Sequence, residues 1–413
     1  MVCLFNDIHS NFILKKIFHN LDKKDYCQII RYNKNLQKKL NITIKDYNLL
    51  YKIYSKIELE IIPTSGKIQT DEIIKRNYKE SFYHITYNYE NNKSIKKKRN
   101  LKSIHIIIDT EFESLNGLFK DCVGIYKFKF LKYKRIDVTD MSEMFSGCFN
   151  MVDVDLSKIK AFSVLDMNNM FKGCKSLEKL DLSKFDTRNI INMSHMFEDC
   201  TNLIELDISN FNTKNVKYMN SMFYGCLNLE KLNLGNIDTR NVIDMGSMFY
   251  NCIYLEDLNI NNFNTENVVN MRAMFSQCKN LDNINVTNFK TSKVTNMSEM
   301  FANCSSLNNL DLSNFKTDNV KNMRDMFKEC FKLKKLDISN FNIEKLENAN
   351  CMFSECRSLK ELKLPEFWKY PKINMDQMFS FCNNKLKSEF KRQYNDIKKE
   401  AFAEANDIAF SLN

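Results

Sequence analysis

The chain has 413 residues and carries 61 Lys and Arg against 51 Asp and Glu, a net charge of +10. The whole positive excess lies in residues 1–100, which hold 20 Lys and Arg against 10 Asp and Glu, while the remainder holds 41 of each. This distribution argues against a protein that wraps nucleic acid along its length, and we expect no nucleic-acid partner. No run of 18 apolar residues occurs, so we also expect no membrane-spanning helix.

Residues 10–60 have the apolar spacing of short helices, with a polar break at Asp22–Asp25. Residues 13–40, ILKKIFHNLDKKDYCQIIRYNKNLQKKL, resemble an F-box, a motif whose helices dock an adaptor protein of a ubiquitin ligase. The alternative is that residues 1–60 form only a helical cap over the first repeat. The resemblance makes four apolar residues candidate adaptor contacts: Ile17, Phe18, Leu21 and Ile30.

Residues 61–111 are predicted to connect this helical segment to the rest of the chain. Ser81–Tyr89 alternates as a strand does, and the isoleucines of Leu101–Ile108 predict a strand that pairs with the first repeat. Lys96–Arg99 is predicted to be a solvated loop, with a nuclear-import signal or a phosphate-contacting patch as alternatives.

A Met-Phe pair then recurs every 26 residues without insertion, from Met144-Phe145 to Met378-Phe379. A degenerate copy, Leu118-Phe119, precedes the series. A cysteine follows each pair at a constant distance, from Cys122 to Cys382. A fixed period of this length is typical of repeat proteins, in which each unit buries its apolar side chains only against its neighbours.

The first half of a repeat has helical spacing. In one unit, Met297, Met300, Phe301 and Cys304 fall at i, i+3, i+4 and i+7, which predicts one face of a helix of about two turns. Asn296 stands where the N-cap of that helix belongs.

The second half of the same unit has strand spacing. Leu310 and Leu312 alternate with Asp311, as in a strand buried on one side. Thr317 and Asn319 follow, and both residue types hydrogen-bond local backbone in turns. Each unit is therefore predicted to contain one short strand, one turn and one short helix.

Across residues 112–380 the units follow the pattern MSxMFxxCxxLxxLDLSNFxTxNVxxM, which resembles the 26-residue repeat of the BspA-like leucine-rich-repeat family of bacterial surface proteins. The resemblance implies a leucine-rich-repeat-like fold and an extracellular binding or adhesion role, without a catalytic motif. The predicted fold is an α/β repeat solenoid of strand–helix rungs with a helical N-terminal domain. The strands of successive rungs are expected to form a continuous parallel sheet along one side.

Residues 385–413 complete the expected architecture. Phe390, Tyr394, Ile397 and Ala401 lie at helical spacing, which predicts an amphipathic helix that caps the open end of the array. The expected divisions of the chain are 1–60, 61–111, 112–384 and 385–413.

The eleven cysteines of the array share one repeat position, on the predicted core face. Cysteine packs there as a small hydrophobe, and equivalent thiols on successive rungs have no unique pairing, so we expect them to be reduced. No CxxC pair occurs, and we expect no metal site.

The predicted partner-binding surface is the polar face of the strands. It consists of the residue between the two strand leucines and the residue two positions before it, both of which point away from the core. The alternative is a solvated face whose small residues only tolerate stacking. The candidates are Asp181, Asp207, Asn233, Asn259, Asn285, Asp311 and Asp337, with Glu205, Lys231 and Asp257 beside them.

No nucleophile with a base and no phosphate loop is evident, so the chain is expected not to be an enzyme and to need no cofactor. The predicted function is binding of a protein partner by a monomer. One alternative is an F-box-like substrate receptor of a ubiquitin ligase, and another is a cell-surface adhesion protein. Met1–Asn11 does not look like a secretory signal, which favours a cytoplasmic location over the cell surface.

Overall fold

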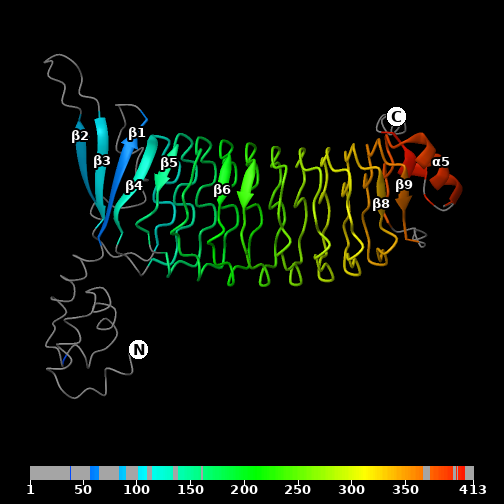
Figure 1. The fold of residues 1–413 in the computed structure, drawn as a ribbon, viewed down its shortest axis with the longest axis horizontal. Helices are drawn as coiled ribbons and strands as arrows, with labels where there is room; N and C mark the ends of the chain where they lie inside the picture. The colour runs from blue at the N-terminus through cyan, green and yellow to red at the C-terminus, as the bar shows by residue number, and fades with distance from the viewer. Residues whose placement is uncertain are drawn as a thin grey trace, which may run out of the picture.

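The computed structural model describes residues 38, 56–64, 83–89, 101–108, 114–133, 138–159, 161–365, 373–393, 397 and 399–404. Figure 1 shows them as a long row of stacked rungs, with a small sheet at one end and helix α5 at the other. The 26-residue period therefore does organise the fold, as the sequence predicts.

The sheet at the N-terminal end has the strand order β2-β3-β1-β4-β5. Its first four strands, which pair antiparallel, are β1 (Ile57–Pro63), β2 (Tyr83–Tyr89), β3 (Leu101–Ile108) and β4 (Ile125–Tyr133). Alternate residues of β1, including Ile57, Leu59 and Ile61, are fully buried. The sheet continues into the array, because β4 is the strand of the first rung and pairs parallel with β5 (Asp153–Asp155), the strand of the next rung.

Two expectations for this end are wrong. Strand β3 does not pair with a repeat but with β1 and β2, and β4 makes the junction instead. Residues 57–60 belong to β1, so the helical segment expected over residues 1–60 does not include them. The F-box-like residues 13–40 lie outside the described residues, apart from Lys38.

The strand side of the array is paired only at intervals. Strand β6 (Glu205–Asp207) pairs parallel with β7 (Lys231–Asn233), and β8 (Lys335–Asp337) pairs with β9 (Glu361–Lys363). Between these pairs the equivalent segments of neighbouring rungs share only an isolated bridge, Asn283 with Asn309. The expected continuous parallel sheet is therefore broken among the described rungs.

The Met-Phe side carries the unbroken ladder, and it is not helical. Parallel bridges join equivalent residues of every successive rung from Ser114 to Asn374. In each rung the alternate N–H groups donate to the next rung, as Phe145 N does to Met170 O at 2.9 Å, instead of to a carbonyl four residues back. Two residues per rung have positive φ, for example Glu299 at 60° and Asn303 at 59°. An α-helix cannot contain them, so the predicted helix is wrong.

The predicted N-cap residues form turns in this arrangement. Asn296 Oδ1 accepts a hydrogen bond from Ser298 N at 3.0 Å, and the same turn recurs at Asp140, Asn192 and Asn348. Thr317 and Asn319 bond between rungs instead of locally: Thr317 Oγ1 donates to Asn342 O, and Asn319 Nδ2 donates to Ser292 O. The array thus uses these polar side chains to hold adjacent rungs together.

The core consists of columns that run the length of the array. From Phe119 to Phe379 the phenylalanines stack with centroids 5.5–5.9 Å apart and ring planes within 16° of each other. Parallel rings at this separation are offset, which is a favourable aromatic arrangement. A threonine column, including Thr213, Thr239 and Thr265, is buried beside the strand turns.

The cysteine column is buried, and its thiols from Cys148 to Cys382 are not in disulfides. Each thiol from Cys148 to Cys382 donates to the carbonyl of the phenylalanine 29 residues earlier, over 3.0–3.2 Å. Burial raises the pKa of these thiols, to about 12 for Cys278. The predicted packing role of the cysteines is consistent with this geometry.

The C-terminal segment caps the last rung by making the contacts that a further rung would make. Helix α5 (Asn384–Gln393) is followed by the 3-10 helix η4 (Lys399–Phe402), so the described part of the expected single helix is two elements. Gln377 N donates to Glu400 O and Phe379 N to Ala401 O, bonds that a further rung would otherwise accept. Phe402 and Phe390 stack on Phe379, at 5.4 and 5.2 Å. The Glu404 carboxylate accepts from Phe381 N at 2.9 Å and ends the ladder.

Candidate functional site

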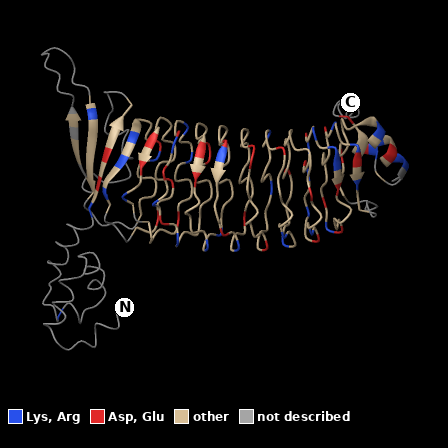
Figure 2. Cartoon of the chain, viewed as in Figure 1, with Lys and Arg blue, Asp and Glu red and all other residues tan. Residues whose placement is uncertain are grey.

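The predicted binding residues all lie on the surface, on the strand side of the rungs. All ten of the candidates from Asp181 to Asp337 are exposed. Figure 2 shows both signs of charge interspersed along the described array, without a block of one sign. The strand side is therefore a polar, mixed-charge surface, as the alternation of the sequence predicts.

The central column of this surface has a structural role that explains its composition. The side-chain oxygen of each Asp or Asn accepts a hydrogen bond from the backbone N–H two residues later, as Asp207 Oδ1 does from Ser209 N at 2.8 Å. Asn233 and Asn285 make the same bond. Because both Asp and Asn form this turn, the rung needs the acceptor oxygen but not the charge.

The aspartates of this column stay ionised to low pH. The Ser183 hydroxyl and N–H lower the pKa of Asp181, and the Ser313 N–H and hydroxyl lower that of Asp311. For Asp337 the Ser339 hydroxyl, Lys363 and the Ser339 N–H together lower the pKa to about 2.

The neighbouring column pairs opposite charges between rungs. Lys231 Nζ lies 2.6 Å from Glu205 Oε1, and Lys335 Nζ lies 2.7 Å from Glu361 Oε1. These pairs are exposed, so each contributes only about 0–1 kcal/mol to stability. Their side chains can therefore exchange partners with a bound molecule at little cost.

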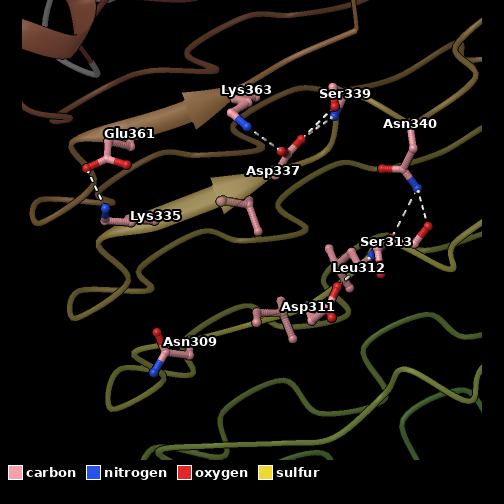
Figure 3. Close-up of a pocket in the computed structure, with 12 residues that line it drawn as sticks. Asn309, Asp311, Leu312, Ser313, Lys335, Asp337, Ser339, Asn340, Glu361 and Lys363 are labelled. Carbon is pink, nitrogen blue, oxygen red and sulfur yellow. Dashed lines mark hydrogen bonds and ion pairs between the residues drawn. The ribbon is translucent and has the colours of Figure 1, made fainter.

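Two grooves lie on this side, each beside a paired strand. The first, of about 650 Å³, is lined by residues of three rungs, including Asp181, Ile204, Glu205 and Lys231. The second, of about 560 Å³, includes Asn309, Asp311, Lys335 and Glu361. Figure 3 shows Lys335 with Glu361, and Lys363 with Asp337, along the walls of the second groove.

Each groove lies where the strand segments of two neighbouring rungs are not paired. The rung before β6 contributes Lys179–Asp181 and the rung before β8 contributes Asn309–Asp311, and neither segment is paired with the strand that follows. The grooves occupy equivalent places five rungs apart, since β6 and β8 are 130 residues apart. Not every candidate lines one: Asn259, Asn285 and Asp257 lie between them.

Sequence reasoning missed the apolar contribution to the first groove. Ile204 lines it and is 45% exposed, at a repeat position where neighbouring rungs carry Glu178 and Glu230. That break in the repeat is a signal that could have found it. The lapses in pairing leave no such signal, because the strand residues keep their pattern throughout.

The adaptor candidates Ile17, Phe18, Leu21 and Ile30 lie outside the described residues, so the F-box hypothesis stays a prediction. In the described part of the chain, none of the helices has the length and apolar character needed to cross a membrane.

A protein-family profile described as "Mycoplasma protein of unknown function, DUF285" matches residues 113–232, 201–285, 219–315 and 280–392. These matches confirm the repeat-family part of the resemblance. No curated protein matches the chain. Among solved structures, a chain in "Crystal structure of TLR13-ssRNA13 complex" aligns at 17% identity and a TM-score of 0.24, over 55% of this chain and 39% of that one. Similarity at this level carries no argument about function.

Proposed function

The chain belongs to the DUF285 family over residues 113–392, and we propose that it is a non-enzymatic interaction protein whose repeat solenoid binds a partner protein on its strand side. The observation that carries this proposal is the pair of equivalent grooves, five rungs apart, lined by exposed strand residues. Repeat arrays offer extended surfaces of this kind to partners.

Three properties of the surface support protein binding. Its carboxylates stay charged at neutral pH, its ion pairs are exposed, and its first groove adds the exposed Ile204. Polar rims around small apolar contacts are typical of transient protein interfaces. The mixed charges favour a protein partner over a polyanion, which would meet Asp and Glu along the whole face. The cytoplasmic location stays a prediction.

The test reverses one charge in each groove without disturbing a turn. Glu205→Lys and Glu361→Lys place lysine at a repeat position that already holds Lys179, Lys231 and Lys335, so the fold accepts it. Glu266→Lys is the matched control, because residue 266 is exposed, lines neither groove and has Arg240 as its counterpart one rung earlier.

The readout is quantitative affinity purification with mass spectrometry on the full chain. We expect at least one protein that is captured by the natural chain and by Glu266→Lys to be lost from the double variant. Identical sets of captured proteins for all three chains would overturn the proposed surface.

A further inference from the structure

Between the first rung and the end of β9, the tyrosines are confined to two rungs. Between residues 138 and 365 the chain has four tyrosines, and all four lie between Tyr218 and Tyr254. Tyr224 and Tyr250 occupy a repeat position that holds Ser, Lys, Glu or Ala in the other rungs, for example Ser276. Because those rungs keep the same backbone without an aromatic ring, the fold does not require tyrosine at these places.

Two of these rings stack on each other across neighbouring rungs, and a third lies exposed four residues after Tyr250. Tyr224 and Tyr250 stack with centroids 4.5 Å apart and planes 8° apart. Tyr254 is 49% exposed, and its N–H donates to Leu227 O on the preceding rung. Leu227, which accepts this bond, and Ile253, the residue before Tyr254, are half-buried. We call these five residues the tyrosine patch, and none of them lines either groove.

A half-buried carboxylate adjoins the patch. Asp199 N donates to Tyr224 O at 2.7 Å, and its carboxylate lies over Gly225, where a Cβ would collide with it. Among the described residues the Asp199 carboxylate accepts no hydrogen bond and forms no ion pair. Burial and the neighbouring Glu198 raise the pKa of Asp199.

The nearby cations are already engaged. Lys172 Nζ lies 3.0 Å from Glu198 Oε1, and His195 pairs with the other oxygen of that carboxylate. Lys175 Nζ lies 5.4 Å from the centre of the Phe149 ring. Asp199 is therefore a negative group beside an aromatic surface, with no ion-pair partner of its own among these side chains.

We propose that the tyrosine patch and Asp199 form a second interaction site, separate from the strand-side grooves, which takes an arginine side chain from an extended segment of a partner protein. A guanidinium is planar, stacks on aromatic rings and pairs with a carboxylate through the same group. Tyrosine and arginine are also the side chains that most often carry the binding energy of an interface. An acidic partner is disfavoured, because it would leave Asp199 without a counter-charge.

The chain itself supplies conservative variants for the test. Tyr224→Ser and Tyr250→Ser introduce the residue that the next rung has at Ser276, and Asp199→Asn introduces the residue found with positive φ at Asn251 and Asn303. Phe331→Ser is the control, since it removes a partly exposed aromatic ring on another rung, where the preceding rung has Ser305.

The probe is an acetylated and amidated Gly-Arg-Gly-Arg-Gly peptide, titrated into the full chain with labelled tyrosine rings and followed by NMR. We expect saturable shifts of a few tyrosine signals in the natural chain. Because Tyr224→Ser/Tyr250→Ser removes reporter rings, the affinity of every variant is measured by isothermal titration calorimetry, in which this double variant should show no binding heat and Phe331→Ser should bind as the natural chain does. Asp199→Asn should weaken binding at least five-fold, and the same peptide with citrulline in place of arginine should not bind. The Glu205→Lys/Glu361→Lys variant should bind normally, which separates this site from the proposed strand-side surface.

The proposal is overturned if the arginine peptide does not saturate, if the citrulline peptide binds equally well, or if the tyrosine double variant binds as the natural chain does. Circular dichroism and melting of every variant show whether a loss of binding reflects unfolding. A binding loss confined to folded Tyr224→Ser/Tyr250→Ser and Asp199→Asn supports the site.

Discussion

The phenylalanine column gives the clearest test of the packing. Phe249 is fully buried and stacks on Phe223 at 5.5 Å and on Phe275 at 5.7 Å. Removing a buried phenylalanine side chain costs about 3–5 kcal/mol, through lost burial and the cavity that remains. We therefore expect Phe249→Ala to lower the free energy of unfolding by about 3–5 kcal/mol.

A second substitution separates the stacking from the burial. Phe249→Leu keeps most of the volume but removes both ring contacts, each of which is worth about 0.5–1.5 kcal/mol, so a loss of about 1–3 kcal/mol is expected. Phe149→Ala is the control, because Phe149 is 44% exposed and lies outside the column. It should change stability by less than about 1 kcal/mol.

Urea unfolding followed by far-UV circular dichroism measures these changes, provided that the slope of the transition stays constant among the variants. The reasoning fails if Phe249→Ala costs less than about 1 kcal/mol, or no more than Phe149→Ala. Either result would mean that Phe249 does not sit in a continuous core.

Three further predictions concern other columns. Gly225→Ala should destabilise the protein more than Gly173→Ala, although both glycines have positive φ. A Cβ at 225 would meet the Asp199 carboxylate, whereas a Cβ at 173 would come no closer than 3.4 Å to the Phe149 ring. Unfolding curves should show that this difference vanishes in an Asp199→Ala background. The ionised Asp337 stabilises the fold fully above its unfolded pKa of about 3.9 and loses this effect as pH falls through about 2. Asp337→Asn, which keeps the acceptor oxygen, should therefore flatten the fall in melting temperature between pH 4 and 2, and an unchanged acid profile would contradict this. Finally, a thiol reagent should modify half-buried Cys351 in the native protein faster than any thiol of the buried cysteine column. Peptide mass spectrometry measures the labelling rates. Rapid labelling of Cys200 or Cys252 in the native protein would refute the burial of the cysteine column.

The repeat pattern predicts correctly which side chains are buried, but it does not predict the backbone conformation. Spacing such as Met297, Met300, Phe301 and Cys304 reports which residues face inward, and all four are fully buried. The same spacing fits consecutive turns as well as a helix, because it says nothing about where the N–H groups donate. The residue at the positive-φ position before the Met-Phe pair gives no warning either, since Glu299, Asp325 and Ala273 all occupy it.

The candidate surface was predicted for its composition but not for its shape. Alternation around Leu310 and Leu312 placed Asp311 outward, where it lies exposed. The intervals at which strand pairing lapses, and hence the positions of the two grooves, depend on small differences between nearly identical rungs. At the N-terminal end, the antiparallel pairing of β1 with β4 joins residues about 70 apart, and no local pattern reports such a contact.

The central claim is that the Met-Phe segments, not the strands, hold the rungs together through a continuous ladder. Amide hydrogen exchange of the full chain, resolved by residue, tests it directly. We expect the N–H groups of Phe145, Phe223 and Phe301, which donate to the next rung, to be the most protected in the array. The N–H groups of residues 257–260 donate to neither neighbouring rung among the described residues, so they should exchange much faster. Slower exchange in residues 257–260 than at these phenylalanines would contradict the claim and restore the continuous sheet that the sequence predicts.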